Sequence, residues 1–275
     1  MALKTVRDIA LGQYIPGKSI MHRLDPRVKI TLTFLYIIFI FVASNYQGLI
    51  LITFLLFSVL FLSGIPISQY LKSLKAILFI VAFTSVLNLF YGSGKAVWHF
   101  KFMTITEGGI SNAIFVAIRI ISLILFSSAL TFTTSPTELT DALERVMKPL
   151  KLLHVKVHEI AMMMTIALRF IPTLLEETDK IMNAQKARGA DLESGGLMQR
   201  IKSLIPILIP LFISSFRRAY DLAMAMECRC YHGGEGRTKM KQLHMTNLDA
   251  TAVAFSLLVC CGVIFCTARF PAAMR

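Results

Sequence analysis

Residues 110–132 read ISNAIFVAIRIISLILFSSALTF, an apolar stretch whose single charged residue is Arg119. The hydrocarbon core of a bilayer needs roughly 20 mostly apolar residues per helix, so this stretch is predicted to cross a membrane. The same reasoning predicts four further spans, at about 30–44, 49–64, 74–91 and 247–268. The whole chain agrees, because 55% of its 275 residues are hydrophobic and only 16% are charged. The sequence therefore predicts an all-α, polytopic membrane protein with about five transmembrane helices.

Positive charge is concentrated in two parts of the chain. Six Lys and Arg residues precede the first span, and 16 lie between Thr133 and Thr246. A formal charge of +13 would suggest nucleic acid in a soluble protein, but in a membrane protein the distribution of Lys and Arg marks the cytoplasmic side. We therefore predict a cytoplasmic N-terminal segment 1–29, a four-helix transmembrane region 30–132, a cytoplasmic coupling domain 133–246, and a last segment 247–275 with the fifth span and an external C-terminus.

Three helices are expected in the predicted coupling domain. The sequence SPTE at 135–138 supplies an N-cap, a proline at the first helical position and a capping glutamate, so a helix should run from there to about Leu150. Apolar residues three and four apart predict long amphipathic helices at about 157–187 and 198–230. Segment 204–216 is short for a span and contains two prolines, so we interpret it as part of a half-buried cytoplasmic or interfacial helix.

Two arginine tripeptides fall at the ends of these two long helices, 41 residues apart: Ala187-Arg188-Gly189 and Cys228-Arg229-Cys230. A guanidinium group stays charged and offers five donors in a rigid fork that can hold carboxylates or helix-end carbonyls. An isolated tripeptide of this kind is usually a solvated arginine at a helix end. Its repetition on the water-facing part of a membrane protein favours a different interpretation, a pair of contacts with a soluble partner.

Other candidate residues have two interpretations each. A charge in the middle of a span costs roughly 2.5 to 3.5 kcal/mol on insertion scales, so Arg119 should face protein, either bracing the bundle or contacting a partner subunit. Core filling is the ordinary role of the run Met162, Met163 and Met164, although an adaptable partner surface would also use methionine.

Catalytic and metal-binding signals are weak. Cys228, Cys230 and His232 are residue types that can hold a soft metal, but small, partly buried thiols are the simpler interpretation. The sequence has no phosphate-binding loop of the G-x-x-x-x-G-K-[ST] type and no credible pair of nucleophile and base. We therefore predict a non-enzymatic chain that binds neither metal nor cofactor.

Several motifs together resemble one family, the T component or transmembrane scaffold of energy-coupling factor (ECF) vitamin transporters, of the EcfT/CbiQ type. The resemblance covers nearly the whole chain and rests, besides the two arginine tripeptides, on MHRLDPRVK at 21–29, TSPTEL at 134–139, and LRFIP at 168–172 followed by Glu176.

The resemblance implies a complex in a bacterial cell membrane with two ABC-type ATPases and a small membrane subunit, the S component, that captures the substrate. Arg188 and Arg229 would insert into grooves of the ATPases, which use ATP and magnesium, and the apolar helix faces would pass the ATPases' movement to the S component. Arg119 and the methionine run are then possible contacts with the S component. The family's second motif commonly reads A-R-G, so Cys228 and Cys230 depart from it.

Two rival functions stay open at this stage. A scaffold of a dedicated cobalt or nickel importer shares the fold family, and spans rich in His or Cys would favour it. A stand-alone secondary transporter would need paired broken helices with intramembrane polar residues in two matching halves, for which Arg119 and Asn88 are thin support. The vitamin itself cannot be named, because another subunit would select it.

Overall fold

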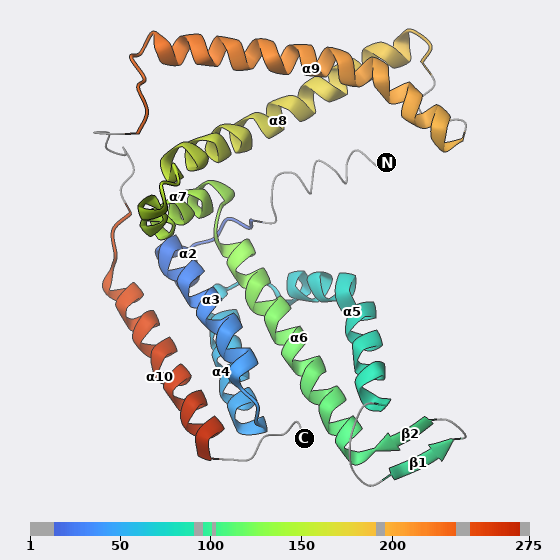
Figure 1. The fold of residues 1–275 in the computed structure, drawn as a ribbon, viewed down its shortest axis with the longest axis vertical. Coiled ribbons are helices and arrows are strands. Elements are labelled where there is room, and N and C mark those ends of the chain that lie inside the picture. Colours follow the sequence, from blue (N-terminus) through green and yellow to red (C-terminus); the bar gives the residue numbers. More distant parts are fainter. Residues whose placement is uncertain (1–13, 91–95, 101–102, 191–195, 235–242, 270–275) are drawn as a thin grey trace. The chain divides into compact units, whose positions relative to one another are not determined.

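The computed structural model describes residues 14–90, 96–100, 103–190, 196–234 and 243–269. Helices dominate these residues, as Figure 1 shows. The long helices are α3 (Pro26–Val42), α4 (Tyr46–Ser63), α5 (Ile67–Phe90), α6 (Glu107–Thr133), α8 (Val157–Ala187), α9 (Leu197–Glu227) and α10 (Asn247–Arg269). The shorter ones are α2 (Ile20–Arg23), α7 (Pro136–Val146) and the 3-10 helix η1 (Lys148–Leu153). The predicted all-α class of a polytopic membrane protein is confirmed.

A two-stranded antiparallel hairpin between α5 and α6 was not predicted. It pairs β1 (Ala96–Phe100) with β2 (Met103–Thr106). Both strands are rich in the β-branched and aromatic residues that favour extended backbone, but this signal is short beside the long apolar runs on either side.

The first predicted helix of the coupling domain begins as expected but ends early. The Ser135 hydroxyl accepts a hydrogen bond from the backbone N–H of Glu138 (3.3 Å), which confirms the predicted cap. The helix was expected to reach about Leu150, but α7 ends at Val146 and η1 follows. Pro149 explains the difference, because proline lacks an N–H donor and disfavours α-helical backbone in the residue before it.

Among the described residues, five helices are long and apolar enough to cross a membrane, namely α4, α5, α6, α8 and α10. This set agrees with the predicted number but differs in one member. Helix α3, predicted as a span, has 17 residues and is about 26 Å long at 1.5 Å per residue. The 31-residue α8 meets the length and composition of a span although we predict it to be cytoplasmic. That location stays a prediction.

The described chain divides into two compact units. One contains the described residues of Glu144–Lys241, and the other those of Gln13–Leu143 and Gln242–Arg275. We call them the arm unit and the bundle unit. In the sequence, the chain therefore passes from the bundle unit to the arm unit within α7 and returns just before α10.

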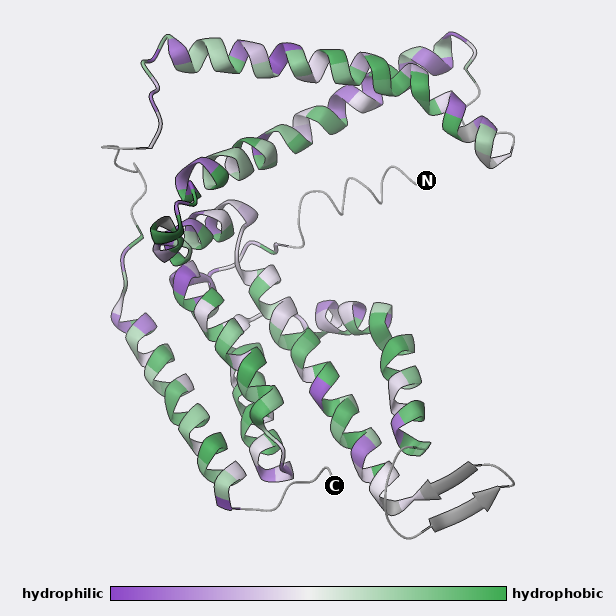
Figure 2. Ribbon diagram, viewed as in Figure 1, coloured by the Kyte–Doolittle hydropathy of each residue, from purple (hydrophilic) through white to green (hydrophobic). Residues whose placement is uncertain are grey.

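The bundle unit is held together by close packing of α3, α4, α6 and α10, which are apolar along most of their length (Figure 2). The ring of Tyr36 stacks on that of Phe126, with their centroids 3.9 Å apart. Gly48 keeps α4 close to its neighbours, because a Cβ atom there would lie 3.3 Å from Ala43 and 3.7 Å from Val263. Small residues at such contacts are expected where lipid, and not water, surrounds the helices.

Candidate functional site

The first arginine tripeptide forms the C-terminal end of α8. Arg188 is the C-cap residue, and Gly189 follows it in the left-handed region with φ +86°. The Gly189 N–H donates to the carbonyl of Lys186 (3.0 Å), and the Ala190 N–H donates to that of Gln185 (3.0 Å). These two bonds make up a Schellman motif, the common left-handed ending of a helix.

The second tripeptide ends α9 in the same way. Cys230 has φ +55°, one of two positive values among the described residues other than glycine. Its N–H donates to the carbonyl of Glu227 (2.8 Å), and the Tyr231 N–H donates to that of Met226 (3.1 Å). The bonds match those around Gly189 one for one, so Arg229 occupies the position in its turn that Arg188 occupies in the other.

Both arginines are free to meet a partner. Arg188 and Arg229 are exposed, and within the described ranges neither guanidinium group makes a hydrogen bond or an ion pair. Each stands where a helix presents its last carbonyl groups, with the small residues Ala187 or Cys228 before it and Gly189 or Cys230 after it. The predicted site residues therefore form two separate but equivalent tips on the arm unit.

The cysteines of the second tip do not match the prediction of partly buried thiols. Cys228 and Cys230 are both exposed and free at the end of α9. No three His, Cys, Asp or Glu residues of the described part lie close enough together to hold a metal ion. Cys230 instead takes the backbone role for which glycine is the usual residue.

Helices α8 and α9, which we call the two arms, are bonded where they cross. Glu177 on α8 accepts a hydrogen bond from the hydroxyl of Ser214 (2.9 Å) and pairs with Arg218, both on α9. Farther along α8, the Gln185 side chain donates to the carbonyl of Pro206 (3.4 Å). The later residue on α8 thus contacts the earlier residue on α9. The arms therefore run antiparallel across the contact, as Figure 1 shows.

The second arm carries a large exposed apolar surface, with side chains that are about half exposed or more: Ile205, Leu208, Ile209, Phe212, Ile213 and Phe216. Such a surface marks contact with lipid or with another protein. On the first arm, Met163 is 58% and Met164 42% exposed, and Met162 is half-buried. The methionine run is thus available for a contact, and whether a partner uses it stays a prediction.

Arg119 braces the bundle unit, one of the two roles weighed for it. Its Nη2 atom donates to the carbonyl of Ala43, the C-cap of α3 (2.9 Å). The guanidinium carbon lies 4.8 Å from the ring centre of Phe115 and 5.6 Å from that of Phe41. A cation at a helix C-terminus and over aromatic faces is favourable on both counts. Its predicted contact with a partner subunit is untested.

Comparison with known proteins identifies the family of the chain. The sequence profile of the family described as cobalt transport protein (CbiQ) matches residues 17–240. A protein of Ruminiclostridium cellulolyticum named energy-coupling factor transporter transmembrane protein EcfT is 54% identical over 94% of this chain and 97% of its own length. The proteins with the same name from Clostridium kluyveri and Bacillus subtilis are 51% and 47% identical, each over 93% of this chain and 96% of their own length. The chain belongs to this family of energy-coupling factor transporter transmembrane proteins.

Proposed function

We propose that the chain is the scaffold subunit of an ATP-driven vitamin importer, which transmits movement from two ABC-type ATPases to a small substrate-binding S component in the membrane. The observation that carries the proposal is the pair of equivalent helix ends, each with an exposed and unpaired arginine. Two related ATPases would offer two similar grooves, one for each arginine. ATP and magnesium would be used by those partners, and this chain would bind no cofactor and catalyse no reaction.

The arms supply the route for the movement. Each tip would be held by one ATPase, and the crossing at Glu177 would make α8 and α9 move as a linked pair. The exposed apolar side chains of α9, with Met163 and Met164 of α8, would pass the movement to the S component. That subunit would reorient and release its cargo.

Purification of the tagged chain from its own host tests the proposal. We expect two ATPases and a small membrane protein to copurify with it, identified by mass spectrometry, and uptake to require ATP hydrolysis. Isolation of the chain alone, together with transport by the chain alone in liposomes, would establish the secondary transporter instead. The description of the matching family keeps a cobalt importer as the second candidate, which a metal-binding S component in the purified complex would identify.

The tips should face the cytoplasm, with the N-terminus on the same side and the C-terminus outside. A variant that keeps Cys230 as its only cysteine is expected to react with a membrane-impermeant thiol reagent in inside-out vesicles but not in intact cells. Ser44→Cys in a cysteine-free chain is the matched control, because the turn between α3 and α4 should be labelled only from outside. Labelling of Cys230 in intact cells would overturn the proposed topology.

A further inference from the structure

Three charged side chains are buried where the bundle unit joins the connections to the arm unit. Asp25 and Lys29, at the start of α3, are each 4% exposed, and Asp249, in the first turn of α10, is 1% exposed. A buried charge is costly unless it is paired and hydrogen-bonded. Their contacts therefore identify what the structure uses them for.

Lys29 holds the end of α6. Its ammonium group donates to the carbonyl of Thr133 (3.0 Å) and to the hydroxyl of Thr134 (3.3 Å), the last residue and the C-cap of that helix. Both threonines are buried, at 1% and 4% exposure. The positive charge thus sits at the negative end of the α6 dipole, where it is most favourable.

Asp25, Arg27 and Asp249 hold the start of α10. The carboxylate of Asp249 accepts hydrogen bonds from the backbone N–H of Asp25 (2.7 Å) and of Thr246 (2.7 Å). Arg27 pairs with Asp25 (2.7 Å) and also donates to the carbonyl of Leu243 (2.8 Å). We call Asp25, Arg27, Lys29 and Asp249 the clamp.

The two places that the clamp holds lie, in the sequence, close to the two connections to the arm unit. Thr133 and Thr134 precede the point where the chain leaves for Glu144–Lys241, and Leu243 and Thr246 follow the point where it returns. The short segment from Asp25 to Lys29 therefore binds both connections, and it does so from a single helix end.

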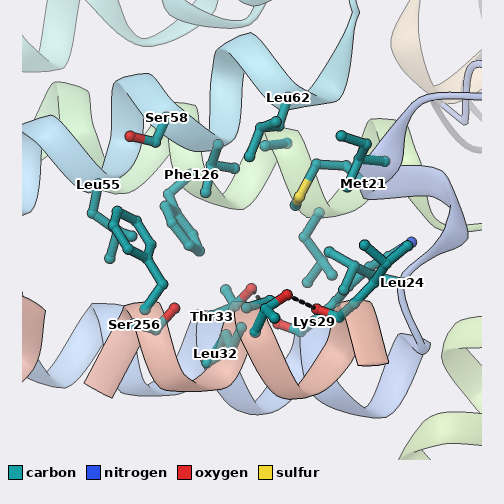
Figure 3. Close-up of a pocket in the computed structure, with 18 residues that line it drawn as sticks. Met21, Leu24, Lys29, Leu32, Thr33, Leu55, Ser58, Leu62, Phe126 and Ser256 are labelled. Atoms are coloured by element: carbon teal, nitrogen blue, oxygen red, sulfur yellow. Dashed lines mark hydrogen bonds between the residues drawn. The ribbon is translucent and has the colours of Figure 1, made fainter. Parts of the chain in front are cut away.

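The hydrogen bonds of the clamp lie beside a gap in the helix packing. Beside the clamp lies a cavity of about 270 Å³ between α3, α4, α6 and α10, lined by Leu24, Leu55 and Phe126 and by the stem of Lys29 (Figure 3). A cavity removes the van der Waals contacts that would otherwise fix the neighbouring helix ends. The hydrogen bonds of the clamp therefore supply fixed contacts next to this gap.

We infer that the clamp transmits the movement of the arms into the bundle unit, a role for positioning residues that rests on the proposed function. When the ATPases displace the arm unit, both of its connections pull on the start of α3. A chain without the clamp keeps its arm tips and its ATPases, but its connections yield. The arms then move without being held by the bundle unit, and the S component is not reoriented relative to it.

The test uses the complete complex in liposomes and measures ATP hydrolysis by phosphate release together with uptake of the radiolabelled vitamin found bound to the purified complex. Lys29→Met removes the charge and donors and keeps the chain length. We expect uptake per ATP hydrolysed to fall by about tenfold, within the usual range of coupling between sites, with the ATPases still bound and active. Thr134→Val, which removes one acceptor only, should lower the ratio less, and Lys29→Arg should restore it. Lys72→Met, at an exposed position on α5, is the matched control.

The outcomes separate the clamp from the proposed function. If uptake per ATP hydrolysed is unchanged in Lys29→Met, even when both rates fall, the clamp does not transmit movement and its role is purely structural. Should Lys29→Met not assemble, the ratio measured for Thr134→Val decides the matter in the same way. Absence of ATPases from the unaltered complex contradicts the proposed function instead.

Discussion

Replacement of Arg188 and Arg229 together by glutamate is expected to release the ATPases from the chain and abolish uptake. Each arginine would be an anchor at the centre of an interface, and loss of such an anchor typically costs about 2 kcal/mol or more. That corresponds to a roughly thirtyfold weaker contact per tip, since 1.4 kcal/mol is a factor of ten. The introduced carboxylates would also enter grooves whose groups bind a cation, and would be repelled there. Copurification of the ATPases and uptake at equal expression are the measurements.

Arg217→Glu provides a matched control for this experiment. Arg217 is exposed on the same helix as the second tip, so the variant makes the charge change of one tip variant away from either helix end. We expect it to bind both ATPases normally, and we expect each single tip variant to keep one of them. Normal ATPase binding by the double variant would show that the tips are not the coupling element.

The long helices could be predicted from the sequence because each depends on its own residues. The apolar run at 110–132 became α6 and the amphipathic pattern at 157–187 became α8, with ends that moved by a few residues at most. Where a local signal was overlooked the prediction was wrong, as at Pro149, which ends α7 early. Such features depend on neighbouring residues alone, so the sequence is sufficient to predict them.

The clamp could not be predicted in this way. The motif at 21–29 was recognised as a family signature, but the roles of its residues depend on partners far away in the chain. Lys29 binds Thr133 and Thr134, 104 and 105 residues distant, and Asp25 binds Asp249, 224 residues distant. A charged residue beside a span signals only that some partner exists, since its identity is fixed by how the helices pack.

The equivalence of the two tips could be predicted only in part, because one of the two helix ends has a recognisable sequence signal. Gly189 marks a left-handed helix end in the sequence, because glycine adopts positive φ without strain. Cys230 gives no such signal, and its departure from A-R-G put its contacts in doubt. Only the backbone bonds of Cys230 and Tyr231 show that the second helix ends as the first does.

Gly189→Val is expected to weaken binding of one ATPase without changing the charge of the tip. A side chain at φ +86° is strained by about 1 to 2 kcal/mol, so the helix should end differently and Arg188 should point elsewhere. Steric crowding by the described residues is excluded as a cause, because, apart from its chain neighbours, none of their heavy atoms lies within 4 Å of a Cβ at this position. We expect the Kd measured by titration of labelled ATPase onto the detergent-solubilised chain to rise by about tenfold.

Two further variants separate backbone geometry from side-chain contact. Gly196→Val adds the same side chain at φ −70°, where the described residues likewise leave the space around a Cβ open, so it should leave the Kd unchanged. Cys230→Gly removes a side chain from the second tip and relieves the strain of its positive φ, so binding there should hold or improve. If the ATPase instead contacts the thiol of Cys230, Cys230→Gly should weaken ATPase binding at the second tip. If Gly189→Val binds normally, the Schellman motif does not position the arginine, and the likeness of the two helix ends has no bearing on how the ATPases are held.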